Sequence, residues 1–126
     1  MTPRVLVVED NPANLELAAA LLEEEGCQVL SAATADAGLI LAVVEHPDLI
    51  LMDVQLPGKT GYEATRRLKA DPATAAIPVV AVTAQAMRGE EAKAREAGCD
   101  AYLTKPLDAR AFRETVRRLL GNDPAR

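Results

Sequence analysis

Three carboxylates stand directly after apolar runs of the sequence, where they could bind a cation. Glu9 and Asp10 follow one such run, and Asp53 ends the run that begins at Leu49. A carboxylate at the rim of a core is costly to desolvate, so it needs water, a partner or a bound cation. Carboxylate oxygens are hard ligands suited to Mg2+, which takes a few of them and retains waters. The acids predict a magnesium site if the fold brings them together.

Two further polar groups follow later apolar runs. Thr83 follows the run Val79–Val82, and Lys105 comes two residues after the run Ala101–Leu103. The threonine hydroxyl can donate to a phosphate oxygen, and the lysine ammonium can stand near a phosphate as a compact point charge. Because no Ser, Cys or His stands at these positions, the available nucleophile is a carboxylate. Phosphoryl transfer needs mainly positioning and charge neutralisation, which these groups supply.

Five short apolar runs alternate with helical patterns along the chain. The expected strands are Val5–Val8, Val29–Leu30, Leu49–Met52, Val79–Val82 and Ala101–Leu103. Their unalternating character suits parallel strands covered on both faces. The helices are expected at about residues 12–25, 35–46, 61–70, 88–97 and 108–120. This alternation predicts the α/β class, as one doubly wound (βα)5 domain with an open parallel sheet and right-handed crossovers.

The first helical pattern carries the clearest punctuation. Asn11 is a suitable N-cap, Pro12 suits the first helical position and Gly26 follows the end. An apolar stripe is expected at Leu15, Ala18, Ala19 and Leu22. Thr34 can cap the next helix in the same way. In an open sheet of this kind, ligands bind beyond the carboxyl ends of the strands, so the polar residues that follow the strands should meet at one edge.

Composition narrows the class of protein. A chain of 126 residues, 49% of them hydrophobic, fits one domain, which we expect to span residues 1–126 with a core at about 3–121. No segment resembles a secretion signal or approaches the ~18 apolar residues of a membrane span, so we expect a cytoplasmic protein without membrane contact. Cys27 and Cys99 lack metal or redox spacing and are expected to be small buried hydrophobes.

Charge is distributed unevenly along the chain. The net charge of −5 disfavours direct nucleic-acid binding. Residues 1–53 hold ten acids and one base (−10 + 1 = −9), and residues 54–126 hold nine acids and thirteen bases (−9 + 13 = +4). Arg113, Arg117 and Arg118 near the C-terminus could contact an acidic partner or simply complement a helix dipole.

Four stretches carry the polar residues over nearly the whole chain: VLVVEDNP, DLILMDVQLPGKTG, VVAVTA and AYLTKP. In order and spacing they resemble the receiver domain of two-component response regulators, and in particular its stand-alone, chemotaxis-regulator-like members. The resemblance implies a flavodoxin-like fold with strand order 2-1-3-4-5. It also implies a phosphorylation-activated switch of a phosphorelay, which accepts a phosphoryl group from a sensor histidine kinase or a histidine phosphotransfer protein.

The resemblance implies a chemical role for each acid. Asp53 would be the phosphoacceptor. Mg2+ would be held by Asp10, Asp53 and the backbone carbonyl of Gln55, and Glu9 would assist through a water molecule. Gln55 and Gln85 fall at the two variable positions that are linked in this family to the rate of dephosphorylation. An acidic pair of Glu and Asp, where some members have two Asp, is a tolerated variation.

The resemblance also implies the residues that sense the phosphoryl group. Lys105 and Thr83 would contact that group, and Thr83 and Tyr102 would form the switch, with Ala84 leaving room for Tyr102 to turn inward. The peptide bond between Lys105 and Pro106 is usually cis in this family. The face made by the fourth helix, fifth strand and fifth helix would then change its affinity for a downstream target protein.

Two other functions fit parts of the pattern. A metal-dependent aspartyl-phosphate phosphohydrolase also places a nucleophilic Asp at a strand end, but such enzymes usually need a second acid two residues later, where this chain has Gln55. A receiver excised from a larger hybrid kinase or regulator would look the same. Because the chain ends soon after the last helix, we expect a stand-alone receiver without an output domain. We expect self-phosphotransfer and self-dephosphorylation only, not an enzyme in the turnover sense.

Overall fold

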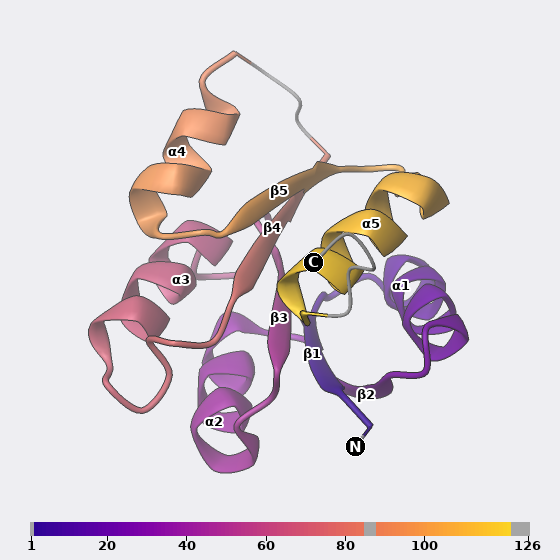
Figure 1. The fold of residues 1–126 in the computed structure, drawn as a ribbon. Coiled ribbons are helices and arrows are strands. Elements are labelled where there is room, and N and C mark those ends of the chain that lie inside the picture. Colours follow the sequence, from indigo (N-terminus) through magenta and orange to yellow (C-terminus); the bar gives the residue numbers. More distant parts are fainter. Residues whose placement is uncertain (1, 85–87, 122–126) are drawn as a thin grey trace.

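The computed structural model describes residues 2–84 and 88–121, in which strands and helices alternate (Figure 1). The elements are β1 (Arg4–Val8), α1 (Pro12–Glu24), β2 (Gln28–Ala32), α2 (Ala35–Glu45), β3 (Leu49–Asp53), α3 (Gly61–Ala70), β4 (Val79–Thr83), α4 (Glu90–Ala97), β5 (Ala101–Thr104) and α5 (Ala109–Leu119). The strands pair in parallel in the order β2-β1-β3-β4-β5. The α/β class and the strand order are therefore confirmed. Gln85 lies outside the described residues.

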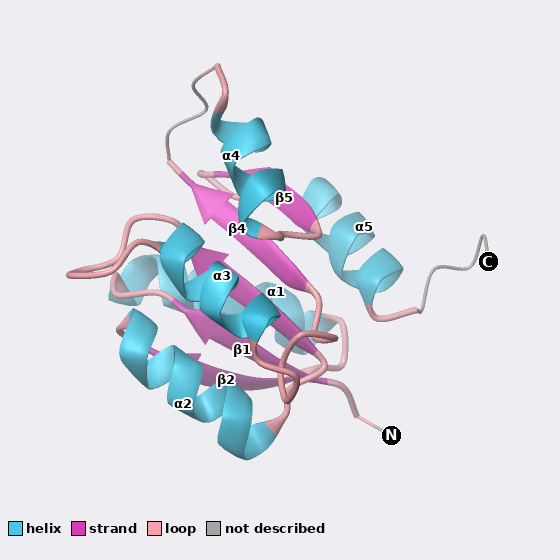
Figure 2. Ribbon diagram, turned by 90° about the vertical axis from the view of Figure 1, so that its left-hand side faces the viewer, coloured by secondary structure: helices cyan, strands magenta, loops and turns pink. Residues whose placement is uncertain are grey.

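The helices cover both faces of the sheet (Figures 1 and 2). Alternate side chains of a strand point to opposite faces, so each central strand feeds two cores. One core packs α1 and α5 against side chains such as Val7 and Leu51 and surrounds Phe112. The other packs α2 and α3 against side chains such as Leu6 and Ile50. The central strands β3 and β4 are buried along their whole length, so their carboxyl ends are held rigidly.

Local sequence signals set the helix starts. The Asn11 side chain accepts hydrogen bonds from the backbone N–H groups of Ala13 and Asn14, at 2.9 and 3.1 Å, and Pro12 takes the first helical position. The Thr34 hydroxyl accepts from the N–H of Ala37 at 3.1 Å and caps α2. Both caps satisfy donors that have no partner within the helix. The predicted caps are confirmed.

Three sequence predictions need correction. The strands at the sheet edges are not covered on both faces, since β2 and β5 are mostly half-buried or exposed. β2 is also longer than its apolar pair Val29 and Leu30, because the polar residues Gln28 and Ser31 belong to it. The buried side of α1 includes Leu21, whereas Ala19 is only half-buried. α4 begins two residues later than predicted because Gly89 takes a left-handed conformation, with φ 90°, which ends the preceding turn.

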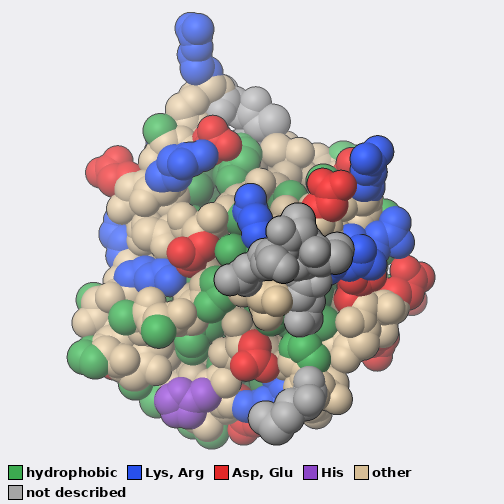
Figure 3. Space-filling view, in the orientation of Figure 1, with side chains coloured by type: hydrophobic (Ala, Val, Ile, Leu, Met, Phe, Trp, Pro, Cys, Tyr) green, Lys and Arg blue, Asp and Glu red, His purple; other side chains and the backbone are tan. Residues whose placement is uncertain are grey.

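The uneven charge distribution is largely balanced within the fold. Arg117 on α5 lies 2.5 Å from Glu25 after α1, and Arg113 lies 3.9 Å from Glu24. Figure 3 shows acidic and basic side chains side by side over α1 and α5. Two of the arginines that could have met an acidic partner thus already pair with acids of the N-terminal half. No helix in the described ranges 2–84 and 88–121 has the length and apolar character needed to cross a membrane.

Candidate functional site

The fold brings together the three acids that the sequence singled out. β1 and β3 are neighbours in the sheet, and Glu9, Asp10 and Asp53 stand at their carboxyl ends with carboxylate oxygens within 4.8 Å of one another. Glu9 is 6% exposed and Asp53 is 4% exposed, whereas Asp10 is open to solvent. Two desolvated carboxylates beside a third need positive charge nearby. The predicted meeting of acids from distant parts of the chain is confirmed.

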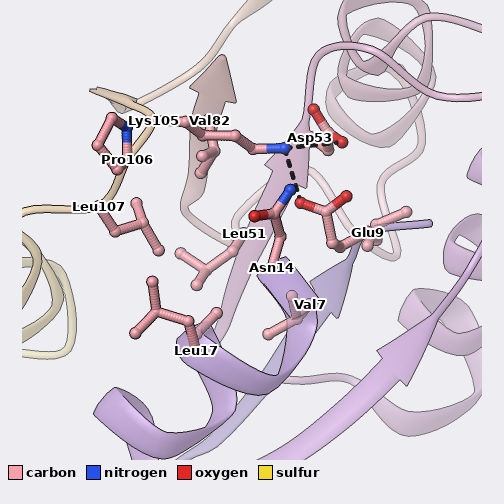
Figure 4. A pocket seen from close by; sticks show the side chains of 12 residues that line it. Val7, Glu9, Asn14, Leu17, Leu51, Asp53, Val82, Lys105, Pro106 and Leu107 are labelled. Atoms are coloured by element: carbon pink, nitrogen blue, oxygen red, sulfur yellow. Dashed lines mark hydrogen bonds and ion pairs between the residues drawn. The ribbon is translucent and has the colours of Figure 1, made fainter. Parts of the chain in front are cut away.

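Lys105 supplies part of that positive charge (Figure 4). It follows β5, and its Nζ lies 2.8 Å from Glu9 Oε1 and 3.2 Å from Asp53 Oδ2. The bond between Lys105 and Pro106 is cis, as the family resemblance implied. Backbone groups complete the shell, because the N–H of Gln55 donates to Asp53 Oδ1 at 3.0 Å and that of Asn11 donates to Glu9 Oε2 at 3.1 Å.

The surroundings shift the pKa values of the two buried carboxyl groups in opposite directions. Burial, and then the neighbouring Glu9 carboxylate, raise the pKa of Asp53 to about 6, against the opposing effect of Lys105. Burial also works to raise the pKa of Glu9, but hydrogen bonds with Asp53 and Lys105 outweigh it and leave that pKa lowered. Although burial opposes its charge, the two acids raise the pKa of Lys105. The single ammonium contacts two of the three carboxyl groups, so excess negative charge remains and this cluster of hard oxygen donors suits a divalent cation.

Thr83 and Tyr102 lie on the next two strands of the sheet. Asp53 pairs in register with Val82, so Thr83, which is 1% exposed, lies one residue further along the neighbouring strand. The N–H of Lys105 donates to the backbone oxygen of Thr83 at 2.8 Å, which joins the ends of β4 and β5. Tyr102 is half-buried on β5 and lines a hollow together with Glu91 and Ala94 of α4. The switch roles of Thr83 and Tyr102 stay predictions.

A small apolar hollow of about 60 Å3 adjoins the acids (Figure 4). It lies between α1 and the segment after β5, and it is lined by Val7, Leu17, Ala18, Leu51, Val82, Pro106 and Leu107, with Asn14, Glu9, Asp53 and Lys105 at its polar end. Glu9 and Asp53 are thus reachable from one side of the carboxyl edge of the sheet.

Sequence reasoning missed one partly buried polar pair, which joins α3 to α4. The hydroxyl of Tyr62, near the start of α3, donates to Glu90 Oε2 at 2.5 Å and lies 3.3 Å from the backbone oxygen of Glu90. Glu90 begins α4 and is 8% exposed. Burial, and then Glu90, raise the pKa of Tyr62, so the hydroxyl stays a donor. The two residues are 28 positions apart and share no local motif that could have revealed the contact.

This fold, with acids at the ends of β1 and β3 and a Lys-Pro step after β5, has the arrangement that the resemblance to receiver domains implied. The family model of the response regulator receiver domain matches residues 5–117, and the chain belongs to that family. It is 45% identical over 122 residues to the polar-differentiation response regulator DivK of Brucella ovis, a match that covers 97% of this chain and 99% of that protein.

Two solved structures are similar over nearly their whole length. One is the receiver domain of a sensor histidine kinase from Pseudomonas aeruginosa PAO1, described with a magnesium ion coordinated in its active-site cleft. It is 33% identical to this chain, with a TM-score of 0.88, and the match covers 96% of this chain and 99% of that one. A CheY-like receiver domain protein from Methanospirillum hungatei JF-1 is 31% identical with a TM-score of 0.87, covering 96% and 95%. The chain is therefore a receiver of the two-component signalling class and does not belong to a classical enzyme family.

Proposed function

We propose that Asp53 accepts a phosphoryl group and that this modification switches the protein between two signalling states. The observation that carries the proposal is the contact of Lys105 with both Glu9 and Asp53, beside the carboxylate of Asp10. The Lys105 ammonium could pair with an incoming anion at this position, so that the charge of the anion would not be buried without a partner. The donor would be a phosphohistidine of a sensor histidine kinase or of a histidine phosphotransfer protein.

The transfer itself needs little from the protein beyond position and charge. An Asp53 carboxylate oxygen forms the new O–P bond while the N–P bond of the phosphohistidine breaks, and the leaving imidazole nitrogen keeps the electron pair of that bond. A pKa of about 6 for Asp53 leaves the attacking carboxylate mostly ionised at neutral pH. Lys105 is close enough to Asp53 to form an ion pair with the oxygens of the transferred phosphoryl group. The Thr83 hydroxyl would contact one of those oxygens.

The acidic cluster fits Mg2+ because it offers hard oxygen donors and excess negative charge. Asp10, Asp53 and the backbone carbonyl of Gln55 would hold the ion, with Glu9 acting through a water molecule, and the ion would neutralise charge on the transferring phosphoryl group. The relative from Pseudomonas aeruginosa, with magnesium in its active-site cleft, supports this assignment. Hydrolysis of the phosphoryl group from Asp53 resets the switch, so the protein acts on its own side chain only.

The signal would leave the protein through the face formed by α4, β5 and α5. Thr83 moves toward phospho-Asp53, Tyr102 turns inward, and the face changes its affinity for a downstream target protein. A shift from mostly inactive to mostly active requires differential stabilisation of about 5 kcal/mol. The similarity to DivK regulators over nearly their whole length supports a stand-alone cytoplasmic receiver that acts through protein partners and not through nucleic acid.

The test is phosphorylation with a small donor. The protein is incubated with acetyl phosphate and Mg2+, and intact masses are compared for the wild type, Asp53→Asn and the control Asp48→Asn, which alters an exposed acid before β3. We expect one added phosphoryl group in the wild type and the control, and none in Asp53→Asn. Labelling that survives Asp53→Asn would move the acceptor elsewhere. Repeated turnover of a phosphate ester would instead support the phosphohydrolase alternative.

A further inference from the structure

The outward side of α2 is apolar. Ile40 and Val44 are each 64% exposed and Val43 is 44% exposed. Among the residues that the structure describes, the large hydrophobic side chains with this degree of exposure are these three and Leu17. Figure 2 shows α2 on the outside of the molecule, next to α3. Helices at a protein surface normally carry polar residues on this side, so the pattern calls for an explanation.

A small residue extends the same side toward the start of the helix. Ala37 is exposed and lies three residues before Ile40 and seven before Val44, which places it on the same helix face. We call Ala37, Ile40, Val43 and Val44 the α2 surface. It tapers from a small side chain at its N-terminal end to large ones at its C-terminal end.

The charges on and beside the α2 surface are paired within the chain. Asp36 stands on the same helix face, four residues before Ile40, with its side chain 77% exposed, and it lies 2.6 Å from Lys59; Glu45 lies 2.9 Å from Arg4. A chain of net charge −5 repels a second copy of itself in general. The α2 surface is a place where that repulsion is locally weak, because both acids of the helix already have basic partners.

We propose that the α2 surface pairs with the α2 surface of a second copy in an antiparallel, two-fold symmetric dimer. In that arrangement the small end of each helix faces the large end of the other, so one tapered surface complements itself. With Ile40 near the symmetry axis, Ala37 of one copy faces the Val43 and Val44 end of its partner. The antiparallel direction also sets opposite helix dipoles side by side.

The area sets the expected strength of the dimer. The α2 surface offers a few hundred Å2 per copy, less than the about 800 Å2 per partner of a standard stable interface. We therefore expect a weak, reversible dimer with a dissociation constant on the order of 100 µM. The proposal does not depend on phosphorylation of Asp53, since α2 and its bordering ion pairs lie outside the acidic cluster.

Sedimentation equilibrium tests the association. The wild type is measured from roughly 10 µM to 1 mM, a range that brackets the expected dissociation constant. We expect its mean mass to rise toward that of a dimer, and the variant Ile40→Gln/Val44→Gln to weaken association at least tenfold. Leu17→Gln, which changes an exposed apolar position on α1 (43% exposed), is the control that should associate like the wild type. A wild type that stays monomeric, or a double variant that associates unchanged while retaining its melting temperature, overturns the proposal.

Cysteine trapping tests the direction of the helices. In a background in which the native cysteines are replaced, Ala37→Cys and Val44→Cys proteins are mixed under mild oxidation. The antiparallel dimer predicts mixed disulfides between the two variants in excess of either homodimer. Cross-linking of each variant mainly to itself would show a parallel pairing and would refute the arrangement.

Discussion

The hydrogen bond from Tyr62 to Glu90 predicts a measurable loss of stability when its donor is removed. Tyr62→Phe deletes one hydroxyl and leaves the ring in place. The acceptor is a carboxylate that is 8% exposed, so the change leaves a desolvated charge short of its 2.5 Å donor. Hydrogen bonds to charged groups contribute about 1.5 to 3 kcal/mol. Because Lys93 lies 3.6 Å from the other carboxylate oxygen of Glu90 and keeps some compensation, we expect the lower end, about 1.5 kcal/mol.

Chemical denaturation of four proteins isolates this hydrogen bond. The wild type, Tyr62→Phe, Glu90→Gln and the double variant form a double-mutant cycle. We expect the midpoint in urea to fall for Tyr62→Phe with an unchanged m-value, and the melting temperature to fall by about 5 °C. We expect Tyr62→Phe to cost much less once Glu90 is replaced. A coupling energy below about 0.5 kcal/mol would refute the reasoning, since independent sites add to within that margin.

Amide hydrogen exchange shows where the stability is lost. Opening of α4 without unfolding of the sheet should become about tenfold more frequent for a loss of 1.4 kcal/mol. We expect faster exchange at Ala94 and Ala97 in Tyr62→Phe and unchanged exchange in β3. Equal acceleration in both elements would show that the hydroxyl supports the whole fold and does not hold α4 in particular.

Two further predictions concern the acidic cluster and its supporting loop. Folding raises the pKa of Asp53 to about 6, so ionising this carboxylate lowers the stability of the folded protein as the pH rises from about 4 to 6. Asp53→Asn removes that cost. In the absence of Mg2+ it should therefore stabilise the protein at pH 7 by about 1 to 2 kcal/mol after solvent screening. Thermal melts should show that gain vanish near pH 4 and shrink when Mg2+ is added. Gly61→Ala should cost about 3 kcal/mol because its Cβ would lie 2.2 Å from the backbone oxygen of Asp53. The control is Gly58→Ala, whose Cβ would meet open space. Its free energy of unfolding should fall by only about 1 kcal/mol, because Gly58 has a positive φ. Equal losses for the two variants in urea unfolding would refute the steric argument.

The interior strands and their polar ends could be predicted because one local rule fixes them. A run such as Val79–Val82 is apolar without alternation only where both faces of a strand are covered, and β4 is buried throughout. The rule weakens at the sheet edges, where Gln28 and Ser31 belong to β2 although they interrupt its apolar pattern. The strand order itself came from the family resemblance, since pairing depends on contacts between distant segments that no local pattern records.

The candidate site could be predicted for the same reason, and its surroundings could not. Parallel strands bring the residues that follow them to one edge, so Asp53 and Lys105 meet although they are 52 positions apart. The bond between Tyr62 and Glu90 follows from the way α3 and α4 pack, and neither residue stands at a strand end. His46 shows a similar limit, because it ends α2 in a left-handed conformation, with φ 47°, that usually marks glycine or asparagine.

The structure divides the receiver into a rigid central sheet, which carries the acidic cluster, and a loosely held helix α4. Asp53 ends a strand that is buried along its whole length, so its backbone position is fixed by the core. α4, in contrast, buries only Ala94 and Ala97 as apolar side chains, whereas α1 buries two leucines as well as an alanine. With so little apolar area to hold it, α4 depends for its position on polar contacts such as that of Glu90 with Tyr62. If Asp53 accepts a phosphoryl group as we propose, a few kcal/mol gained there would be enough to move α4 while the sheet stays intact, because the energy that fixes the helix is of the same size.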